Sequence, residues 1–226
     1  MKLLLMSILV AKVAFPSPEP SLDAVKSRFE QAAVEWHSID QVNWPAYPYK
    51  PEVRFRIMHS ETEIYLQFHV RGNGVRATYD YDFGSRPFKD DCVEFFMIPS
   101  DRDSTYYNFE MNCIGHGTFD YGTDRNGRHC CGEEILRQIR RESTLGSTAF
   151  GMREGPQEWT LTVAIPKRLY AQTDLDLTSF SGRTVRANFY KCGDDTAVPH
   201  YLSWNPIQVP KPDFHRPDYF GEIRFE

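Results

Sequence analysis

Two neighbouring stretches decide the fold, Asp91-Cys-Val-Glu-Phe-Phe-Met-Ile98 and Tyr106-Tyr-Asn-Phe-Glu-Met-Asn112. In both, every second residue shares a chemical character, which is the two-residue period of a β-strand. The polar segment Ser100-Asp-Arg-Asp-Ser-Thr105 between them predicts a hairpin. One face of the hairpin is apolar and is expected to face the core; it carries Val93, Phe95, Met97, Tyr107, Phe109 and Met111.

The opposite face of this hairpin is a candidate binding surface. It carries Glu94, Phe96, Tyr106, Asn108, Glu110 and Asn112. If this face were only exposed to solvent, Lys, Thr and Ser would be equally suitable there. A face that combines carboxylates, amides and aromatic rings instead offers hydrogen-bonding groups beside flat apolar surfaces, so we expect a ligand there.

The same alternation predicts further strands along the chain, at Val53–Ile57, Ile64–Val70, Trp159–Ile165, Thr184–Cys192 and Glu222–Phe225. The short Ser60-Glu-Thr62 connection predicts a hairpin between the first two. Trp159 alternates with Leu161 and Val163 and is therefore expected in the core.

Helical patterns are few. Ser21 is a predicted helix cap, followed by apolar residues at helical spacing: Leu22, Val25, Phe29, Ala32 and Trp36. The segment Glu133–Ser143 fits either a short helix or a strand, and its length does not decide between them.

The first 20 residues are interpreted as an N-terminal strand or a signal-like segment, and residues 21–226 as one β-sandwich domain. Met1–Val10 resembles the charged start and apolar core of a signal peptide, but Lys12 interrupts the apolar run and no small-x-small cleavage site precedes Phe15. No other segment is long enough to span a bilayer.

Composition narrows the class of ligand. The chain has 226 residues, of which 14% are aromatic, and a formal net charge of −5. Binding to nucleic acid needs a basic face, and Lys and Arg form no evident cluster, so a neutral ligand is favoured. The 15 prolines and 14 glycines fall mostly between short apolar runs, as turns between short strands require.

The cysteines are expected to be free thiols. Their number is odd, and they show no C-x-x-C pair or histidine spacing typical of zinc: Cys92, Cys113, Cys130, Cys131 and Cys192. Free thiols favour a reducing, cytoplasmic location, with a secreted or periplasmic location as the alternative.

Three later segments combine aromatic rings with polar groups: Asn188–Asp194, Pro199–Pro206 and Pro212–Pro217. A sugar ring needs this combination, because its C–H face packs on an aromatic plane and its hydroxyls need polar partners. With Asp91–Phe96 and Tyr106–Asn112, from about Trp44 to Glu226, the chain resembles the family 9-like carbohydrate-binding modules.

The resemblance implies an all-β protein, a DOMON-like two-sheet antiparallel β-sandwich with one N-terminal helix and long connecting loops. It implies reversible, non-catalytic binding of a sugar terminus in carbohydrate catabolism. The ligand would be a plant-type oligo- or polysaccharide such as a β-linked glucan or xylan, and separately encoded glycoside hydrolases would be partners.

The resemblance also implies the site residues. Phe88 stands where the family has an aromatic residue, typically Trp, and Glu94 matches the family's Val-Glu strand. Trp204 is the predicted second stacking ring, although Phe88 and Trp204 could both be core residues instead. The predicted hydrogen-bonding partners are Asn108, Glu110, Asn112, Asn188 and Tyr190.

Two basic residues of the predicted strand Thr184–Cys192 lie on opposite faces of the strand. Arg186 faces the same way as Asn188 and is a candidate for the family's arginine, whereas Lys191 faces the other way and is expected to be a solvated or edge charge.

Members of the family can carry structural calcium, which favours oxygen-rich loops. The candidate ligands are two Asp-x-Asp groups, Asp80 with Asp82 and Asp101 with Asp103. Acidic residues are also common in turns for backbone hydrogen bonding alone.

Two other functions are alternatives. Glu94 and Glu110 could form the carboxylate pair of a glycoside hydrolase, although an open polar face would not raise a carboxyl pKa as hydrolysis requires. Haem-binding proteins share the sandwich architecture, so fold alone does not exclude a redox cofactor.

Overall fold

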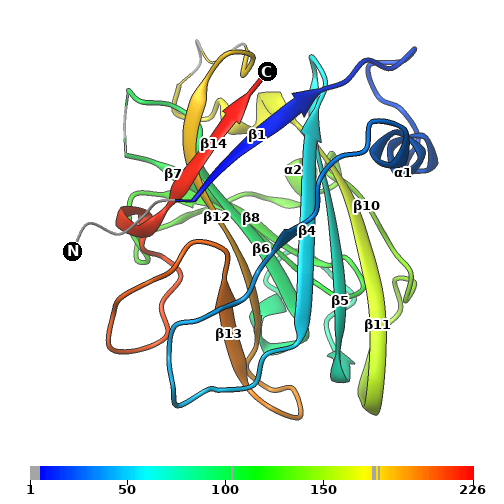
Figure 1. Ribbon diagram of the computed structural model, residues 1–226, viewed down its shortest axis with the longest axis vertical. Helices are drawn as coiled ribbons and strands as arrows, with labels where there is room; N and C mark the ends of the chain where they lie inside the picture. The colour runs from blue at the N-terminus through cyan, green and yellow to red at the C-terminus, as the bar shows by residue number, and fades with distance from the viewer. Residues whose placement is uncertain (1–5, 103, 175–176, 178) are drawn as a thin grey trace.

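The computed structural model describes residues 6–102, 104–174, 177 and 179–226, and it confirms an all-β fold. The described strands form one curled sheet of 14 strands, in the order β10-β11-β5-β4-β1-β14-β12-β6-β7-β8-β9 (Figure 1). β13 pairs with β12 and β3, and β2 pairs with β4.

The strands have the following bounds: β1 Ser7–Lys12, β2 His37–Ser38, β3 Gln41–Val42, β4 Glu52–His59, β5 Glu63–Ala77, β6 Cys92–Ile98, β7 Tyr106–Asn112, β8 Gly117–Gly122, β9 His129–Cys130, β10 Arg140–Ser143, β11 Phe150–Pro166, β12 Thr184–Gly193, β13 His200–Ser203 and β14 Gly221–Phe225. The helices are α1 Leu22–Gln31 and α2 Glu133–Leu136, with short 3₁₀ turns η1 Pro87–Lys89, η2 Lys167–Tyr170 and η3 Pro217–Tyr219.

β1 joins two halves of this sheet, and its pairs are parallel, which the predicted two-sheet antiparallel β-sandwich did not include. Ser7–Val10 pair in parallel with β14, and Ala11 and Lys12 pair in parallel with β4. Figure 1 shows β1 lying beside β14. Parallel pairing is available because no hairpin connects β1 to either neighbour. We call β4, β5, β10 and β11 the back sheet, and β12, β6, β7 and β8 the front sheet.

The main core lies between the back and front sheets. Phe55 of β4 stacks on Phe189 of β12 at 3.6 Å between ring centroids, and Phe189 stacks in turn on Phe95 of β6 at 4.7 Å. The predicted core faces of β6 and β7 and the predicted burial of Trp159 are confirmed. Burial of these large aromatic side chains supplies the main favourable free energy of the fold.

Helix α1 covers the outer face of the back sheet, where Val25 and Phe29 pack on Met58, Tyr65 and Ala164. The predicted cap is confirmed, because the Ser21 side chain accepts a hydrogen bond from the backbone N–H of Ala24 at 3.2 Å.

Two sequence predictions need adjustment outside the core. Helix α1 ends at Gln31, so Trp36 lies beyond the helix, contrary to the prediction. The ambiguous segment Glu133–Ser143 contains both predicted elements, first α2 and then β10.

The outer face of the front sheet is covered by the chain between β13 and β14. The ring of Tyr190 on β12 stacks on Phe214 at 4.3 Å with an interplanar angle of 8°, and its hydroxyl donates to the Phe214 carbonyl at 3.1 Å. As a result, every residue of β6 and β7 is buried. The sequence correctly predicted which residues face outward, but the expectation that this face is open is wrong.

Lys191 is not the solvated or edge charge that the sequence suggested. β12 lies between β6 and β14 and also pairs with β13, so Lys191 is fully buried. Its ammonium forms an ion pair with Asp91 and donates to Nε2 of His200 at 2.7 Å. Asp91 also accepts the indole N–H of Trp159 at 2.7 Å. Burial lowers the pKa of His200 to about 3, so the imidazole is neutral and its Nε2 can accept the hydrogen bond from the lysine ammonium.

Among the described residues, no helix has the length and apolar character needed to cross a membrane.

Asp91→Ala tests the buried ion pair, because it leaves the Lys191 ammonium without its counter-ion in the interior. We expect the free energy of unfolding to fall by about 3–5 kcal/mol, measured by urea denaturation. The control Arg137→Ala removes an exposed i,i+4 ion pair with Glu133 and should cost less than about 1 kcal/mol. Equal losses in the two variants would contradict a special role for the buried pair.

Candidate functional site

A pocket of about 340 Å³ lies on the outer face of the front sheet. Its floor comes from four adjacent strands: Cys192 on β12, Glu94 on β6, Asn108 and Glu110 on β7, and Thr118 and Asp120 on β8. Glu94 lies directly opposite Glu110 in the antiparallel register, and Glu110 lies opposite Thr118. The floor is therefore a row of polar side chains across paired strands, which hold them at fixed spacing.

The walls of the pocket come from loops. One wall contains Ser85, Pro87 and Phe88 around η1, another contains Pro212, Asp213, Phe214 and His215, and Asp194 and Tyr201 lie beside the end of β12. The loop between β8 and β9 contributes Arg125 and Arg128. Loops on a rigid sheet are a common setting for binding residues.

Arg128 organises the polar side of the floor. Its guanidinium donates to the Asn108 side-chain oxygen at 2.8 Å and to the Tyr106 carbonyl at 3.0 Å, and it lies 4.1 Å from the Tyr106 ring centroid. Asn108 in turn donates to Glu110 at 2.9 Å. This chain of bonds fixes the orientation of the Asn108 amide, with oxygen toward the cation and nitrogen toward the carboxyl.

The two floor glutamates have raised pKa values. Burial raises the pKa of Glu94 well above its usual range, and the nearby Cys192 and Glu110 raise it further. Burial also raises the pKa of Glu110 to about 7, against the lowering effect of the hydrogen bond from Asn108. A protonated carboxyl can donate as well as accept a hydrogen bond, so Glu94 can meet either role of a ligand hydroxyl.

His215 is a neutral wall residue. Its Nδ1 lies 2.8 Å from the Tyr106 hydroxyl, and its Nε2 lies 4.0 Å from a Glu110 oxygen. Burial lowers the pKa of His215 to about 3, with a further contribution from Arg128. The contact with Glu110 is therefore not an ion pair near neutral pH.

Phe88 places an aromatic ring at this pocket, and 36% of the residue is exposed. Its carbonyl accepts the backbone N–H of Asp194 at 2.9 Å, which fastens η1 to the end of β12. The Tyr201 hydroxyl donates to the Asp194 carboxylate at 2.9 Å. The ring of Phe88 is thus held beside polar groups and stays accessible to a ligand.

The structure brings four of the eight predicted site residues together in this pocket: Phe88, Glu94, Asn108 and Glu110. The pocket also includes parts of the three late segments singled out in the sequence, namely Cys192, Asp194, Tyr201 and Pro212 to His215.

The prediction that Trp204 is a stacking ring is wrong for this structure. Trp204 is 2% exposed and lies in the core between the sheets, edge-on to Phe55 at 6.2 Å and to Phe189 at 5.8 Å. The prolines that follow it suggested a loop. The residue itself directly follows β13 and faces inward, as the alternative interpretation allowed.

The other three predicted residues have structural contacts and do not line the pocket. Asn112 accepts the backbone N–H of His116 at 3.0 Å and so shapes the turn between β7 and β8. Asn188 donates to the Asn205 carbonyl at 3.0 Å and accepts the Asn205 backbone N–H at 2.9 Å. Tyr190 lies beneath Phe214. All three support the cover or the turns around the pocket.

Arg128 is a pocket residue that the sequence analysis missed, whereas the candidate Arg186 lies outside the pocket and donates to the Pro217 carbonyl at 3.3 Å. A sequence pattern that could have predicted Arg128 lies in β8, where Thr118 and Asp120 alternate with Phe119 and Tyr121. This alternation indicates a third strand beside β7, whose polar residues continue the binding face toward the loop that carries Arg128.

In the first acidic pair, both oxygens of Asp82 accept hydrogen bonds from Arg141, at 3.1 and 2.9 Å. Calcium also accepts carbonyl oxygens as ligands, so calcium at Asp80 and Asp82 stays a prediction. Asp103 lies outside the described residues, so calcium at Asp101 and Asp103 stays a prediction.

A family model and solved structures match this chain. The model of carbohydrate-binding family 9 matches residues 23–225. A crystal structure of a provisionally assigned carbohydrate-binding protein from Bacteroides uniformis ATCC 8492 is 40% identical, with a TM-score of 0.92 over 97% of this chain and 99% of that chain. No curated protein matches in a sequence search.

More distant structures share the fold. A family 9 carbohydrate-binding module from Caldicellulosiruptor kristjanssonii in complex with glucose is 14% identical, with a TM-score of 0.57 over 98% of this chain and 96% of that chain. The same organism's module in complex with cellotriose is 15% identical, with a TM-score of 0.56 over 98% and 94%.

These matches define the class of protein as a β-sandwich module of a carbohydrate-binding family. The chain belongs to carbohydrate-binding family 9.

Glu110→Gln tests the protonation of the floor. Glu110 has a higher pKa in the folded protein, about 7, than its ordinary value of 4.5. Its stabilising contribution is therefore complete below pH 4.5 and is lost as pH rises through 7. Because Gln mimics the protonated acid, the variant should match the wild type near pH 4.5 and be more stable at pH 8, by about 1–3 kcal/mol.

The measurement is urea denaturation across this pH range, with Glu154→Gln as an exposed control outside the pocket. A Glu110→Gln variant that is less stable than the wild type at pH 8 would refute the raised pKa.

Proposed function

We propose that this protein binds a carbohydrate reversibly, without cleaving it, in the pocket over β12, β6, β7 and β8. The observation that carries the proposal is the arrangement of one partly exposed ring, Phe88, beside a floor of converging carboxyl, amide and guanidinium groups. A sugar presents an apolar ring face and a polar rim to such a site, and the two kinds of surface are complementary.

The hydrogen-bonding capacity of the floor suits a polyhydroxylated, uncharged ligand. Arg128 donates, a protonated Glu94 donates and accepts, and the Glu110 carboxyl titrates near neutral pH. Arg125 and Arg128 share the pocket with five acidic residues, and burial raises the pKa values of four of these, which reduces the negative charge of the lining: Glu94, Glu110, Asp120 and Asp194. A hydroxyl can both donate and accept, whereas a strongly charged ligand would need a lining of one sign.

The end of a sugar chain is the favoured ligand. The pocket is bounded by η1 on one wall and by Pro212 to His215 on another, and its volume of about 340 Å³ is near the lower end for small-molecule sites. The Caldicellulosiruptor module was solved with glucose and with cellotriose, which supports a β-linked glucan or a related xylan as the class to test. Such an end would be supplied in carbohydrate catabolism by separately encoded glycoside hydrolases.

Glycoside hydrolysis is the second candidate, because Glu94 and Glu110 lie directly opposite each other with raised pKa values. Hydrolysis needs one carboxylate ionised, as nucleophile or base, while the other stays protonated. A Glu110 pKa of about 7 beside a Glu94 pKa well above its usual range allows this division, so the pKa values alone do not separate the two functions. We prefer binding because the family model that matches the chain is that of a carbohydrate-binding family.

Phe88→Ala tests the binding site. Loss of the stacking surface should weaken binding of cello- or xylo-oligosaccharides at least tenfold, equivalent to about 1.4 kcal/mol, from a wild-type Kd expected in the micromolar to millimolar range. Isothermal titration calorimetry measures this, and Phe83→Ala, which removes an exposed ring outside the pocket, is the matched control. Equal affinities of wild type and Phe88→Ala for every bound sugar would show that the assigned pocket is not the site.

Glu94→Gln separates binding from hydrolysis. We expect wild type and variant alike to release no new reducing ends during prolonged incubation with oligosaccharides that bind, measured by a reducing-sugar assay. The variant should still bind, with an affinity changed less than about 30-fold, since Gln keeps one acceptor and gains donors. Turnover by the wild type that Glu94→Gln abolishes would establish the hydrolase instead.

A further inference from the structure

Cys92, Glu94 and Cys192 come together at the floor of the pocket, although Cys92 and Cys192 are 100 positions apart in the chain. Cys92 and Cys192 are directly opposite each other in the antiparallel pairing of β6 with β12. Glu94 follows Cys92 by two residues on β6, so its side chain is on the same face of the sheet. One ligand atom from each of the three lies within 4.8 Å of the others.

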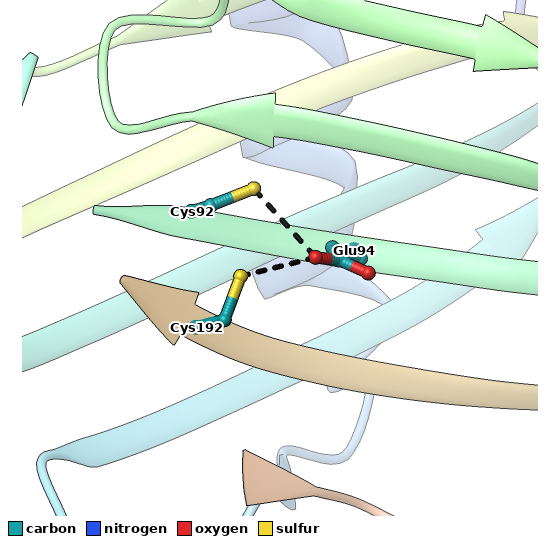
Figure 2. A group of neighbouring side chains, drawn as sticks. All are labelled: Cys92, Glu94 and Cys192. Atoms are coloured by element: carbon teal, nitrogen blue, oxygen red, sulfur yellow. Dashed lines mark hydrogen bonds between the residues drawn. The ribbon is translucent and has the colours of Figure 1, made fainter. Parts of the chain in front are cut away.

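The three side chains converge on one another (Figure 2). The thiol of Cys192 donates to Oε1 of Glu94 at 3.1 Å, and the thiol of Cys92 donates to the same oxygen at 4.0 Å. In a tetrahedral zinc site with Zn–S bonds of about 2.3 Å and Zn–O bonds of about 2.1 Å, a sulfur and an oxygen are separated by about 3.6 Å. The two observed distances bracket that value.

We propose that Cys92, Glu94 and Cys192 form a binding site for a thiophilic divalent cation such as Zn²⁺. Two thiolates and a carboxylate are ligands that zinc accepts, and thiolates select it over calcium and magnesium. Glu94 and Cys192 also line the pocket, which offers the cation an entry path and a source of water for a fourth ligand.

The triad is buried, with exposed fractions of 0% for Cys92, 3% for Glu94 and 2% for Cys192. Metal binding releases the protons of its thiol ligands, and a bound dication then compensates the negative charge of the ionised ligands in this buried setting.

The site requires no sugar, so it can be tested apart from the proposed function. Cd²⁺ is a suitable probe, because its bonds to thiolates give a charge-transfer absorption in the ultraviolet. Reduced protein freed of metal by a chelator should bind one equivalent of Cd²⁺ with this absorption, and Zn²⁺ should displace it. Cys192→Ser should weaken Cd²⁺ binding at least tenfold, and Cys130→Ser, which removes an exposed cysteine outside the triad, should leave it unchanged.

A second measurement does not depend on variants that might misfold. X-ray absorption of the zinc-loaded wild type should show two sulfur ligands per zinc at about 2.3 Å, with the remaining ligands oxygen. A shell of oxygen and nitrogen only would overturn the proposal, as would Cd²⁺ absorption lost in Cys130→Ser but retained in Cys192→Ser. A peptide map that joins Cys92 to Cys192 by a disulfide, combined with no Cd²⁺ absorption after reduction, would also overturn it.

Glu94 belongs to both sites, so a bound cation would change the proposed contact between Glu94 and a sugar. This consequence rests on the proposed function. Sugar titration of metal-free protein tests the carbohydrate site alone. Metal titration without sugar tests the triad alone, so failure of one proposal is distinguishable from failure of the other.

Discussion

The constraint on which the structure depends is that β6 and β7 are buried on both faces. One face packs into the aromatic core between the sheets, and the other lies beneath the segment that joins β13 to β14. Polar side chains on the covered face must satisfy one another, because buried polar groups without partners cost about 1–3 kcal/mol each. The chain from Arg128 through Asn108 to Glu110 does this, and the raised pKa values of the glutamates have the same origin.

The segment between β13 and β14 is attached to β12 beside the pocket. Tyr190 holds Phe214 by stacking and by a hydrogen bond, and Asn188 holds Asn205 because its side-chain nitrogen donates to the Asn205 carbonyl and its side-chain oxygen accepts the Asn205 backbone N–H. Both attachments start from β12, the strand that also carries Cys192 into the pocket. β12 therefore positions both part of the floor and the wall that contains Phe214, and strands position side chains more rigidly than loops do.

The sequence predicted correctly which face of a strand each side chain occupies, but it did not predict which faces are covered by distant segments of the chain. Alternation assigned each side chain of β6 and β7 to the correct face, because that information lies in neighbouring residues. Whether a face is open depends on segments far along the chain, so the burial of Glu94 and Glu110 was not predictable by period alone. Lys191 and Trp204 were misplaced for the same reason: one is neutralised by Asp91, about 100 residues earlier, and the other is enclosed by Phe55 and Phe189. Arg128 was missed because β8 was not recognised.

The position of β1 has a consequence for folding. Ser7 pairs with Glu222 and Val10 with Phe225, so each pair joins residues 215 positions apart in the sequence. The bridge between the back and front sheets through β1 and β14 therefore closes a very long loop, and such pairings form slowly because chain entropy is lost before the contacts are made. Until β14 docks, the edges of β1 and β12 that pair with it are open, and unpaired edges invite association with other chains.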